Sequence, residues 1–261
     1  MEPNDLQLAF ALADAAAAVT LPAFGGRQSV ELKADATPVT VVDGAAERAI
    51  RDLLRTHRPG DGLIGEEGSR VESTSGRVWV VDPIDGTKLF AEGIPLWTTL
   101  IALRDGDEMV VAVADAPALG ERFHAVRGEG AWRGGDRVHV SDVEPLSEAF
   151  VLHAALEEFD RGTGVKALLE VVSTCRASRG IADAWAHLLV ARGAAEALVE
   201  QGPCFEWDWA ATGLIVEEAG GSLTRLEGGP AVPGCHLLVT NGRVDAEIRG
   251  ALGVPGAAAS Q

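Results

Sequence analysis

The chain has 261 residues, of which 47 % are hydrophobic and 23 % are charged. This composition supports a sizeable buried core and excludes a disordered or low-complexity chain. Asp and Glu outnumber Lys and Arg by 39 to 22, so the formal net charge is −17. Such a charge disfavours binding to nucleic acid or to an anionic membrane. An anionic substrate would need local positive charge, for which bound metal ions are a ready source.

The chain contains three cysteines and no Cys-x-x-Cys motif. This argues against a disulfide framework or a structural zinc site, and we expect a reducing, cytoplasmic location. No run of about 18 apolar residues occurs, so no membrane-spanning helix is predicted. The Ala-rich segment from Leu6 to Phe24 lacks a basic start, and we expect a mature helix there rather than a signal peptide.

The first half of the chain indicates two helices and then a β-rich stretch. Asn4 or Asp5 can cap the first helix, which would run to about Val19 and be stopped by Pro22. The second helix is expected to open at Asp43 and to end near Arg58. Apolar runs then predict six strands, with a hairpin turn at 104–107 between the third and the fourth. These strands lie at 62–65, 78–81, 97–103, 109–116, 122–126 and 130–133.

From about Pro145, helices and strands alternate. Helices are predicted at 164–171, 181–192, 208–219 and from about 245, and strands at 150–153, 197–200, 222–225 and 236–240. Gly220 and Gly221 suit the C-terminal end of the third of these helices. The pattern predicts an α/β protein of two halves packed as layers, residues 1–145 and residues 146–261.

The segment Trp79–Thr87 reads W-V-V-D-P-I-D-G-T and places Asp82 and Asp85 at the end of a buried strand. Two carboxylates so close together suit a hard divalent cation such as Mg²⁺. Backbone N–H groups after Gly86 would point at an anion, as they do at helix N-termini. One loop could therefore hold a metal and a phosphate, although the same pattern is typical of a strand followed by a capped turn.

Three more acidic segments could join this site. Glu66 and Glu67 follow a short apolar strand and would repel each other unless a cation lay between them; the alternative is an exposed acidic turn. Asp208, in E-W-D-W-A-A, lies at a helix start and could be only an N-cap. Asp43, after T-P-V-T, could also be an N-cap, or it could hold a water together with Thr40.

In order and content, these four segments resemble those of the inositol monophosphatase superfamily of metal-dependent phosphatases. The resemblance extends from about Leu6 to Glu247. It implies an alternating αβαβα sandwich, usually a homodimer, that hydrolyses a phosphomonoester with two or three Mg²⁺ ions, for which Mn²⁺ is a possible substitute. A Ser or Cys nucleophile lacks support, because neither G-x-S-x-G nor C-x₅-R occurs.

The resemblance also implies roles for single residues. Five oxygen donors would hold two metal ions, and Asp82 would contact both ions. The donors are Glu66, Asp82, the Ile84 carbonyl, Asp85 and Asp208. Gly86 and Thr87 would offer N–H groups to the phosphate. Thr87 and Asp43 would orient and deprotonate the attacking water, and Glu67 would be a supporting carboxylate. Lys33, on the loop before Asp43, would help to close the site.

Residues that recognise the substrate are expected in the second half. The segment S-R-G-I-A-D, from Ser178 to Asp183, resembles the R-x-x-G-D segment of the histidinol-phosphatase branch of actinobacteria, with Ala182 in place of Gly. Asp183 could pair with the ammonium group of an amino-alcohol phosphate such as histidinol phosphate, or it could cap a helix. Arg179 could reach the phosphate or form a surface ion pair.

The family pattern also includes a Glu that contacts substrate hydroxyls. Glu200 and Glu206 compete for this role, because the segment from Glu200 to Asp208 is one residue longer than in relatives. The predicted activity is hydrolysis of a small phosphorylated metabolite, foremost histidinol phosphate, with inositol-1-phosphate or another sugar or cyclitol phosphate as the alternative. A non-catalytic phosphate-binding protein would be marked by a lost metal ligand, and every predicted ligand is present.

Overall fold

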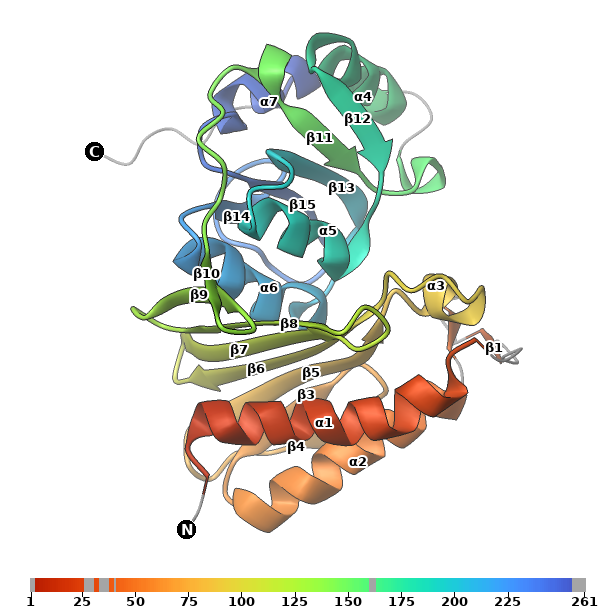
Figure 1. Cartoon of the computed structure of the whole chain (residues 1–261), viewed down its shortest axis with the longest axis vertical. Helices are drawn as coiled ribbons and strands as arrows, with labels where there is room; N and C mark the ends of the chain where they lie inside the picture. Colours follow the sequence, from red (N-terminus) through yellow and green to blue (C-terminus); the bar gives the residue numbers. More distant parts are fainter. Residues whose placement is uncertain (1–2, 26–30, 33–37, 40, 160–162, 255–261) are drawn as a thin grey trace.

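The structure is a computed structural model that describes residues 3–25, 31–32, 38–39, 41–159 and 163–254. Helices and sheets alternate along its long axis as five layers (Figure 1). An outer pair of helices, an eight-stranded sheet, a second pair of helices, a five-stranded sheet and a third pair of helices follow one another. The predicted layered αβαβα arrangement is confirmed.

The first outer layer consists of α1 (Asp5–Ala23) and α2 (Val41–His57), which pack against each other and against the eight-stranded sheet. Only β3 and β5 pair in parallel in that sheet, and all other neighbours are antiparallel. In spatial order its strands are β10 (Asp136–Val138), β9 (Gly130–Arg133), β8 (Glu121–Val126), β7 (Glu108–Ala116), β6 (Thr98–Asp105), β5 (Arg77–Asp85), β3 (Gly62–Gly65) and β4 (Arg70–Val71). A separate small ladder pairs β1 (Glu31–Leu32) with β2 (Pro38–Val39).

The second sheet has five strands. Of its four strand pairings in spatial order, the first two are parallel and the last two are antiparallel. In spatial order they are β12 (Ala177–Gly180), β11 (Phe150–His153), β13 (Ala197–Cys204), β15 (Cys235–Thr240) and β14 (Ser222–Arg225). The remaining helices are α3 (Thr87–Ala91), α4 (Thr163–Thr174), α5 (Asp183–Ala191), α6 (Glu206–Glu218) and α7 (Asp245–Leu252), with single 3₁₀ turns η1 (Leu146–Glu148) and η2 (Leu156–Glu158). The predicted division at 145/146 falls between β10 and η1.

The central helix layer lies between the two sheets, and its burial follows from that position. α5 and α6 share one large cluster of buried apolar side chains with both sheets, to which Leu100 of β6, Leu214 of α6 and Val239 of β15 belong. Every residue of α6 from Ala210 to Val216 is buried. A helix that is covered on opposite faces is apolar all round, and this explains why α6 carries no polar stripe.

α1 is long and apolar enough, by length and composition, to cross a membrane. Its buried side chains, among them Leu8 and Leu12, belong to a core cluster that also holds Ile50 of α2 and Ile101 of β6. A core helix of a folded domain passes the same test, and the packing of α1 against α2, β6 and β7 gives its apolar face a partner within this chain.

The prediction that the first helix ends near Val19, before Pro22, was wrong by about four residues. Pro22 lies inside α1, which ends at Ala23. A proline in the last turn removes a single backbone hydrogen bond, so its cost there is small. The N–H of Phe24 then closes the helix by donating to the carbonyls of Thr20 (3.0 Å) and Leu21 (3.3 Å).

Two predicted helix starts also need correction, because α2 begins before Asp43 and α6 begins before Asp208. Both carboxylates therefore lie within the first helical turn and are not N-caps. The helix expected at 181–192 begins instead at Asp183, and the strand expected to end at residue 81 continues to Asp85. β4, β10 and β12 were not predicted, because these edge strands of two to four residues lack apolar alternation.

Candidate active site

Asp82 and Asp85 reach the same side of the sheet because β5 is irregular between them. Residues three apart in a regular strand point to opposite faces. Here Asp82 pairs with Leu100 and Asp85 pairs with Thr98, so β5 carries one residue more than β6 between these two pairs. Such a bulge turns the strand and redirects the following side chain. Pro83 lies in the bulge, where its missing N–H costs no ladder hydrogen bond.

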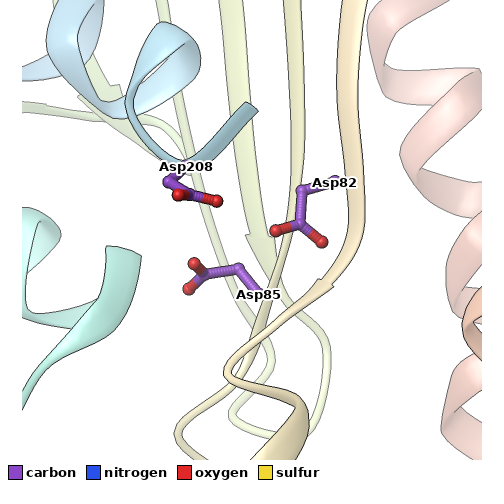
Figure 2. A group of neighbouring side chains, drawn as sticks. All are labelled: Asp82, Asp85 and Asp208. Atoms are coloured by element: carbon purple, nitrogen blue, oxygen red, sulfur yellow. The ribbon is translucent and has the colours of Figure 1, made fainter. Parts of the chain in front are cut away.

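Asp208 approaches these two carboxylates from the other half of the chain. It lies in the first turn of α6, and its carboxylate accepts a hydrogen bond of 2.6 Å from the N–H of Phe205. One oxygen each from Asp82, Asp85 and Asp208 lie within 4.8 Å of one another. Figure 2 shows the three carboxylates facing a common space, two from the end of β5 and one from α6.

Burial and mutual repulsion oppose ionisation of this cluster. Burial, followed by the nearby Glu66, raises the pKa of Asp82 well above its usual value. Burial and then Asp183 do the same to the pKa of Asp85. The pKa of Asp208 is raised to about 8, mainly by burial, although the hydrogen bond from Phe205 opposes the rise. A cation among these groups would favour their charged forms and so oppose all three shifts.

A second pair of contacts joins α2 to the start of α3. The hydroxyl of Thr87 lies 3.1 Å from Oδ1 of Asp43 and 3.0 Å from the carbonyl oxygen of Ile84, and it can donate to either. Both Thr87 and Asp43 are buried. Gly86, just before α3, has a φ of +85°, and a Cβ there would lie 3.3 Å from the carbonyl oxygen of Leu96. Glycine is therefore required by both conformation and space.

Glu66 and Glu67 lie in the turn that follows β3. This turn is stabilised by Glu47, a residue that was not predicted to belong to the site. The buried carboxylate of Glu47, on α2, accepts hydrogen bonds from the N–H groups of Glu67 (2.7 Å) and Ser69 (2.8 Å). A Cβ at Gly65 would clash with this carboxylate. The sequence does contain a signal for this role, because Glu47 is an acidic residue on the apolar face of the predicted helix, three residues before Ile50.

The carboxylates open into a cavity of about 420 Å³. Six acidic residues line it, and none of the lining residues in the described part of the chain is Arg or Lys: Glu66, Asp85, Glu158, Asp183, Glu200 and Asp208. A phosphate group could not enter such a cavity without a cation to reverse the local field. The chemistry of the donors fits the predicted metal, because carboxylate and carbonyl oxygens are the ligands that Mg²⁺ prefers.

The comparisons with known proteins agree with this geometry. The model of the "Inositol monophosphatase family" matches residues 3–253. The chain belongs to the inositol monophosphatase family. A histidinol-phosphatase of Streptomyces coelicolor is 40 % identical over 259 residues, covering 95 % of this chain and 97 % of that protein. A histidinol-phosphatase of Mycobacterium tuberculosis is 39 % identical over 254 residues, with the same coverage of both chains, 95 % and 97 %.

Solved structures of the family show the same fold. The extragenic suppressor protein suhB of Bartonella henselae has a TM-score of 0.88 and 29 % identity, over 94 % of this chain and 96 % of that chain. Members of the inositol monophosphatase family are metal-dependent phosphomonoesterases, and the present chain is a phosphatase. Its acidic triad of Asp82, Asp85 and Asp208 can bind a metal ion.

Among the residues predicted to contact substrate, Asp183 and Glu200 line the cavity of this family member. Glu206 does not share that position, because its carboxylate pairs with Arg104 at 2.6 Å on another side of α6. Arg179 is exposed on β12 and donates to the carbonyl of its neighbour Ser178 at 2.6 Å, outside the cavity lining. Lys33 and Thr40 lie outside the described residues.

Asp183 does not act as an N-cap. It is the first residue of α5, and it has a φ of +59°, which is rare for a residue with a side chain. Burial and then Glu200 raise its pKa to about 7. A cationic ligand beside Asp183 would favour its charged form.

His187 is a cavity residue that the sequence analysis overlooked. Its Nε2 lies 3.1 Å from Oε2 of Glu200, and its Nδ1 lies 2.7 Å from the hydroxyl of Thr212. Through these contacts, His187 fixes the orientation of the Glu200 carboxylate. Trp207, in the first turn of α6, lines the cavity and stacks on Phe205 with 5.3 Å between ring centroids.

Proposed function

We propose that this phosphatase uses Mg²⁺ to hydrolyse the monoester of a small phosphorylated metabolite, and that its substrate is histidinol phosphate. The observation that carries the proposal is the composition of the cavity. Asp82, Asp85 and Asp208 form a candidate cation site, two of whose carboxylates line the cavity together with Asp183 and Glu200. A ligand with a phosphate at one end and an ammonium group at the other matches this distribution of charge.

The donors predicted to hold the first ion are Glu66, Asp82 and the carbonyl of Ile84, and those for the second ion are Asp82, Asp85 and Asp208. The Thr87 hydroxyl lies 3.0 Å from the Ile84 carbonyl oxygen, and when its single proton is donated to Asp43 both lone pairs of that carbonyl are available to an ion. Bound Mg²⁺ supplies charge stabilisation to the phosphate oxygens and makes water easier to deprotonate. Glu67 supports this end of the cavity through the turn that Glu47 anchors.

Thr87 and Asp43 are the residues that we assign to the attacking water. The Thr87 hydroxyl accepts a hydrogen bond from the water and donates its own proton to Asp43, 3.1 Å away. As the water oxygen bonds to phosphorus, its proton moves to Thr87 and the Thr87 proton moves to Asp43. The bond between phosphorus and the ester oxygen breaks, and the ester oxygen takes a proton from a solvent water and leaves as the alcohol. The hydroxide formed from that water takes the proton held by Asp43, so that inorganic phosphate and the alcohol are the only products. The N–H groups of Gly86 and Thr87 bind the phosphate oxygens.

Asp183 and Glu200 are the residues that we assign to recognition of the organic part of the substrate. Their carboxylates and that of Glu158 give this end of the cavity a negative charge, which favours an amine over a neutral sugar. His187 holds Glu200 in place. The names of the two relatives described above support the same substrate. Arg179 would contribute only if β12 moved toward the cavity.

We also propose that the enzyme acts in the cytoplasm as a homodimer. Its three cysteines, Cys175, Cys204 and Cys235, are all free thiols, which suits a reducing compartment. Sedimentation equilibrium tests the dimer, because the mass of one chain is 27.2 kDa.

The experiment that tests the substrate compares phosphate release from histidinol phosphate and from inositol-1-phosphate, each with Mg²⁺. We expect a preference for histidinol phosphate. In Asp183→Asn, kcat/KM for this substrate should fall by about tenfold or more, because a charge-assisted contact is lost, while kcat/KM for inositol-1-phosphate should change little. Asp208→Asn is the control that should lower both activities. A preference for inositol-1-phosphate in the unaltered enzyme would overturn this substrate and leave the alternative, a sugar or cyclitol phosphate.

A further inference from the structure

A second cavity has a volume of about 620 Å³, and its described lining shares no residue with that of the acidic cavity. It is bounded by the C-terminal half of α2 and by residues 68–71, which form a turn and the edge strand β4. Four arginines line it: Arg51, Arg55, Arg58 and Arg70. This is a strong local excess of positive charge in a chain whose formal charge is −17.

The arginines of this cavity are only partly neutralised. Arg55 and Arg70 are exposed, and among the described residues neither lies within ion-pair distance of a carboxylate. Nε of Arg51 lies 3.6 Å from the carboxylate of Asp52 and is buried without a hydrogen-bond partner. Arg58 is better satisfied, since it lies 3.5 Å from Asp5.

The one acidic side chain in the lining does not balance these cations. Asp61 is buried, and its two oxygens accept hydrogen bonds from Nε1 of Trp79 (2.9 Å) and from the hydroxyl of Ser75 (2.8 Å). Its carboxylate is therefore engaged with the protein on both sides. The net charge of the cavity remains positive, in contrast to the acidic cavity, whose described lining has six carboxylates.

We propose that this cavity is a binding site for the phosphate group of a small molecule, separate from the active site. Guanidinium groups form paired hydrogen bonds with phosphate oxygens, and several of them can approach one tetrahedral dianion from different directions. A ligand with a single carboxylate carries less negative charge than a phosphate dianion and would neutralise less of the positive charge of the four arginines. The walls formed by Leu54, Leu63 and Val71 provide apolar surface for the organic part of the ligand, and the volume lies within the range of small-molecule sites.

The position of the site connects it to the catalytic end of the protein. Gly68 and Ser69 line the arginine cavity, and they directly follow Glu66 and Glu67 in the chain. The N–H of Ser69 is held by Glu47, as is the N–H of Glu67. A ligand in the arginine cavity thus contacts the turn that carries a predicted metal ligand.

The test is titration calorimetry of the Mg²⁺-loaded enzyme with inorganic phosphate, at constant ionic strength set with chloride. The unaltered enzyme should bind two phosphates per chain, one at the active site and one in the arginine cavity. The variant Arg55→Gln/Arg70→Gln should lose the second binding event or weaken it by about tenfold or more, because two charge-assisted contacts are removed. Both side chains are exposed, so this variant should fold normally.

A variant with the same change in net charge controls for non-specific attraction. Lys166→Gln/Arg243→Gln also removes two exposed cations, which lie on α4 and before α7, away from the arginine cavity. It should still bind two phosphates. The proposal is overturned if the unaltered enzyme binds a single phosphate, or if both double variants bind phosphate equally. Neither result would affect the proposed phosphatase activity, which is measured separately as phosphate release.

Discussion

The carboxylate of Glu47 lies 2.7 Å from the backbone nitrogen of Glu67 and accepts its hydrogen bond. With the second bond from Ser69, at 2.8 Å, it holds the turn that carries Glu66, a predicted metal ligand. The turn is thus held by a residue on a helix, twenty positions earlier in the chain. Its geometry depends on α2 being docked against the end of β3.

Replacing Glu47 should disturb both stability and metal affinity. In Glu47→Gln the side chain keeps its shape but loses its charge and one of its two acceptor oxygens. We expect the free energy of unfolding to fall by about 1–3 kcal/mol, because a buried N–H loses its partner. Urea unfolding measures this fall, and the Mg²⁺ concentration for half-maximal phosphate release should rise. Glu170→Gln on α4 is the exposed control. Unchanged Mg²⁺ dependence would show that the turn does not need this anchor.

The Thr87 hydroxyl is the most direct test of the proposed water-activating pair. Thr87→Val keeps the side-chain shape and removes the contact to Asp43. We expect kcat to fall by about 100-fold or more, as is typical for loss of a group that transfers protons. Affinity for Mg²⁺, measured by calorimetry, should change little. The matched control is Thr20→Val, in which a buried hydroxyl bonded to the carbonyl of Ala16 is lost far from the site. Equal activities in the two variants would exclude a role for Thr87.

Metal removal should have an effect on stability that depends on pH. The acidic cluster has folded-state pKa values above the unfolded value of about 4, and that of Asp208 reaches about 8. Between these values the folded metal-free protein binds more protons than the unfolded chain. Its stability therefore falls as the pH rises from about 4 to about 8. Bound Mg²⁺ compensates the same charges, so its stabilising effect should increase over this range.

Thermal unfolding measured with Mg²⁺ and with EDTA checks this expectation. The difference in Tm between the two conditions should be larger at pH 8 than at pH 6. In Asp82→Asn/Asp208→Asn, two of the charges are removed, and the metal-free protein should become less sensitive to pH. An Mg²⁺ effect of the same size at both values would contradict the assignment of these carboxylates to a metal site.

His187 should act on substrate affinity through Glu200. In His187→Phe the ring volume is roughly kept, but Oε2 of Glu200 loses its partner at 3.1 Å. We expect KM for histidinol phosphate to rise by about tenfold while kcat changes much less, because the altered group is remote from the phosphate. His124→Phe on β8 controls for the substitution itself, since His124 packs edge-on to Phe10 outside the cavity. A fall in kcat with constant KM would instead place His187 in the chemical step.

The local parts of the fold could be predicted because short-range patterns specify them. β9, β11 and β14 have the predicted bounds, and the hairpin at 104–107 joins β6 to β7. Helix starts were less predictable at Asp43 and Asp208, because an acidic residue is favourable both as an N-cap and within the first turn. Edge strands such as β12 form through pairing with a neighbour, and their own residues show no strand pattern.

The amino-acid sequence by itself determined which chemistry is available: carboxylates at the end of a buried strand, a glycine and a threonine after them, and the family to which this order belongs. The tertiary structure decided which of these groups meet. The bulge in β5 turns Asp82 and Asp85 to one side, and the packing of α6 between the sheets brings Asp208 to them from more than 120 positions away. It also placed Glu200 rather than Glu206 in the cavity, because Glu200 lies on β13 and lines the cavity, whereas Glu206 begins α6 and pairs with Arg104. Distances between side chains of different elements depend on packing, and sequence spacing does not contain them.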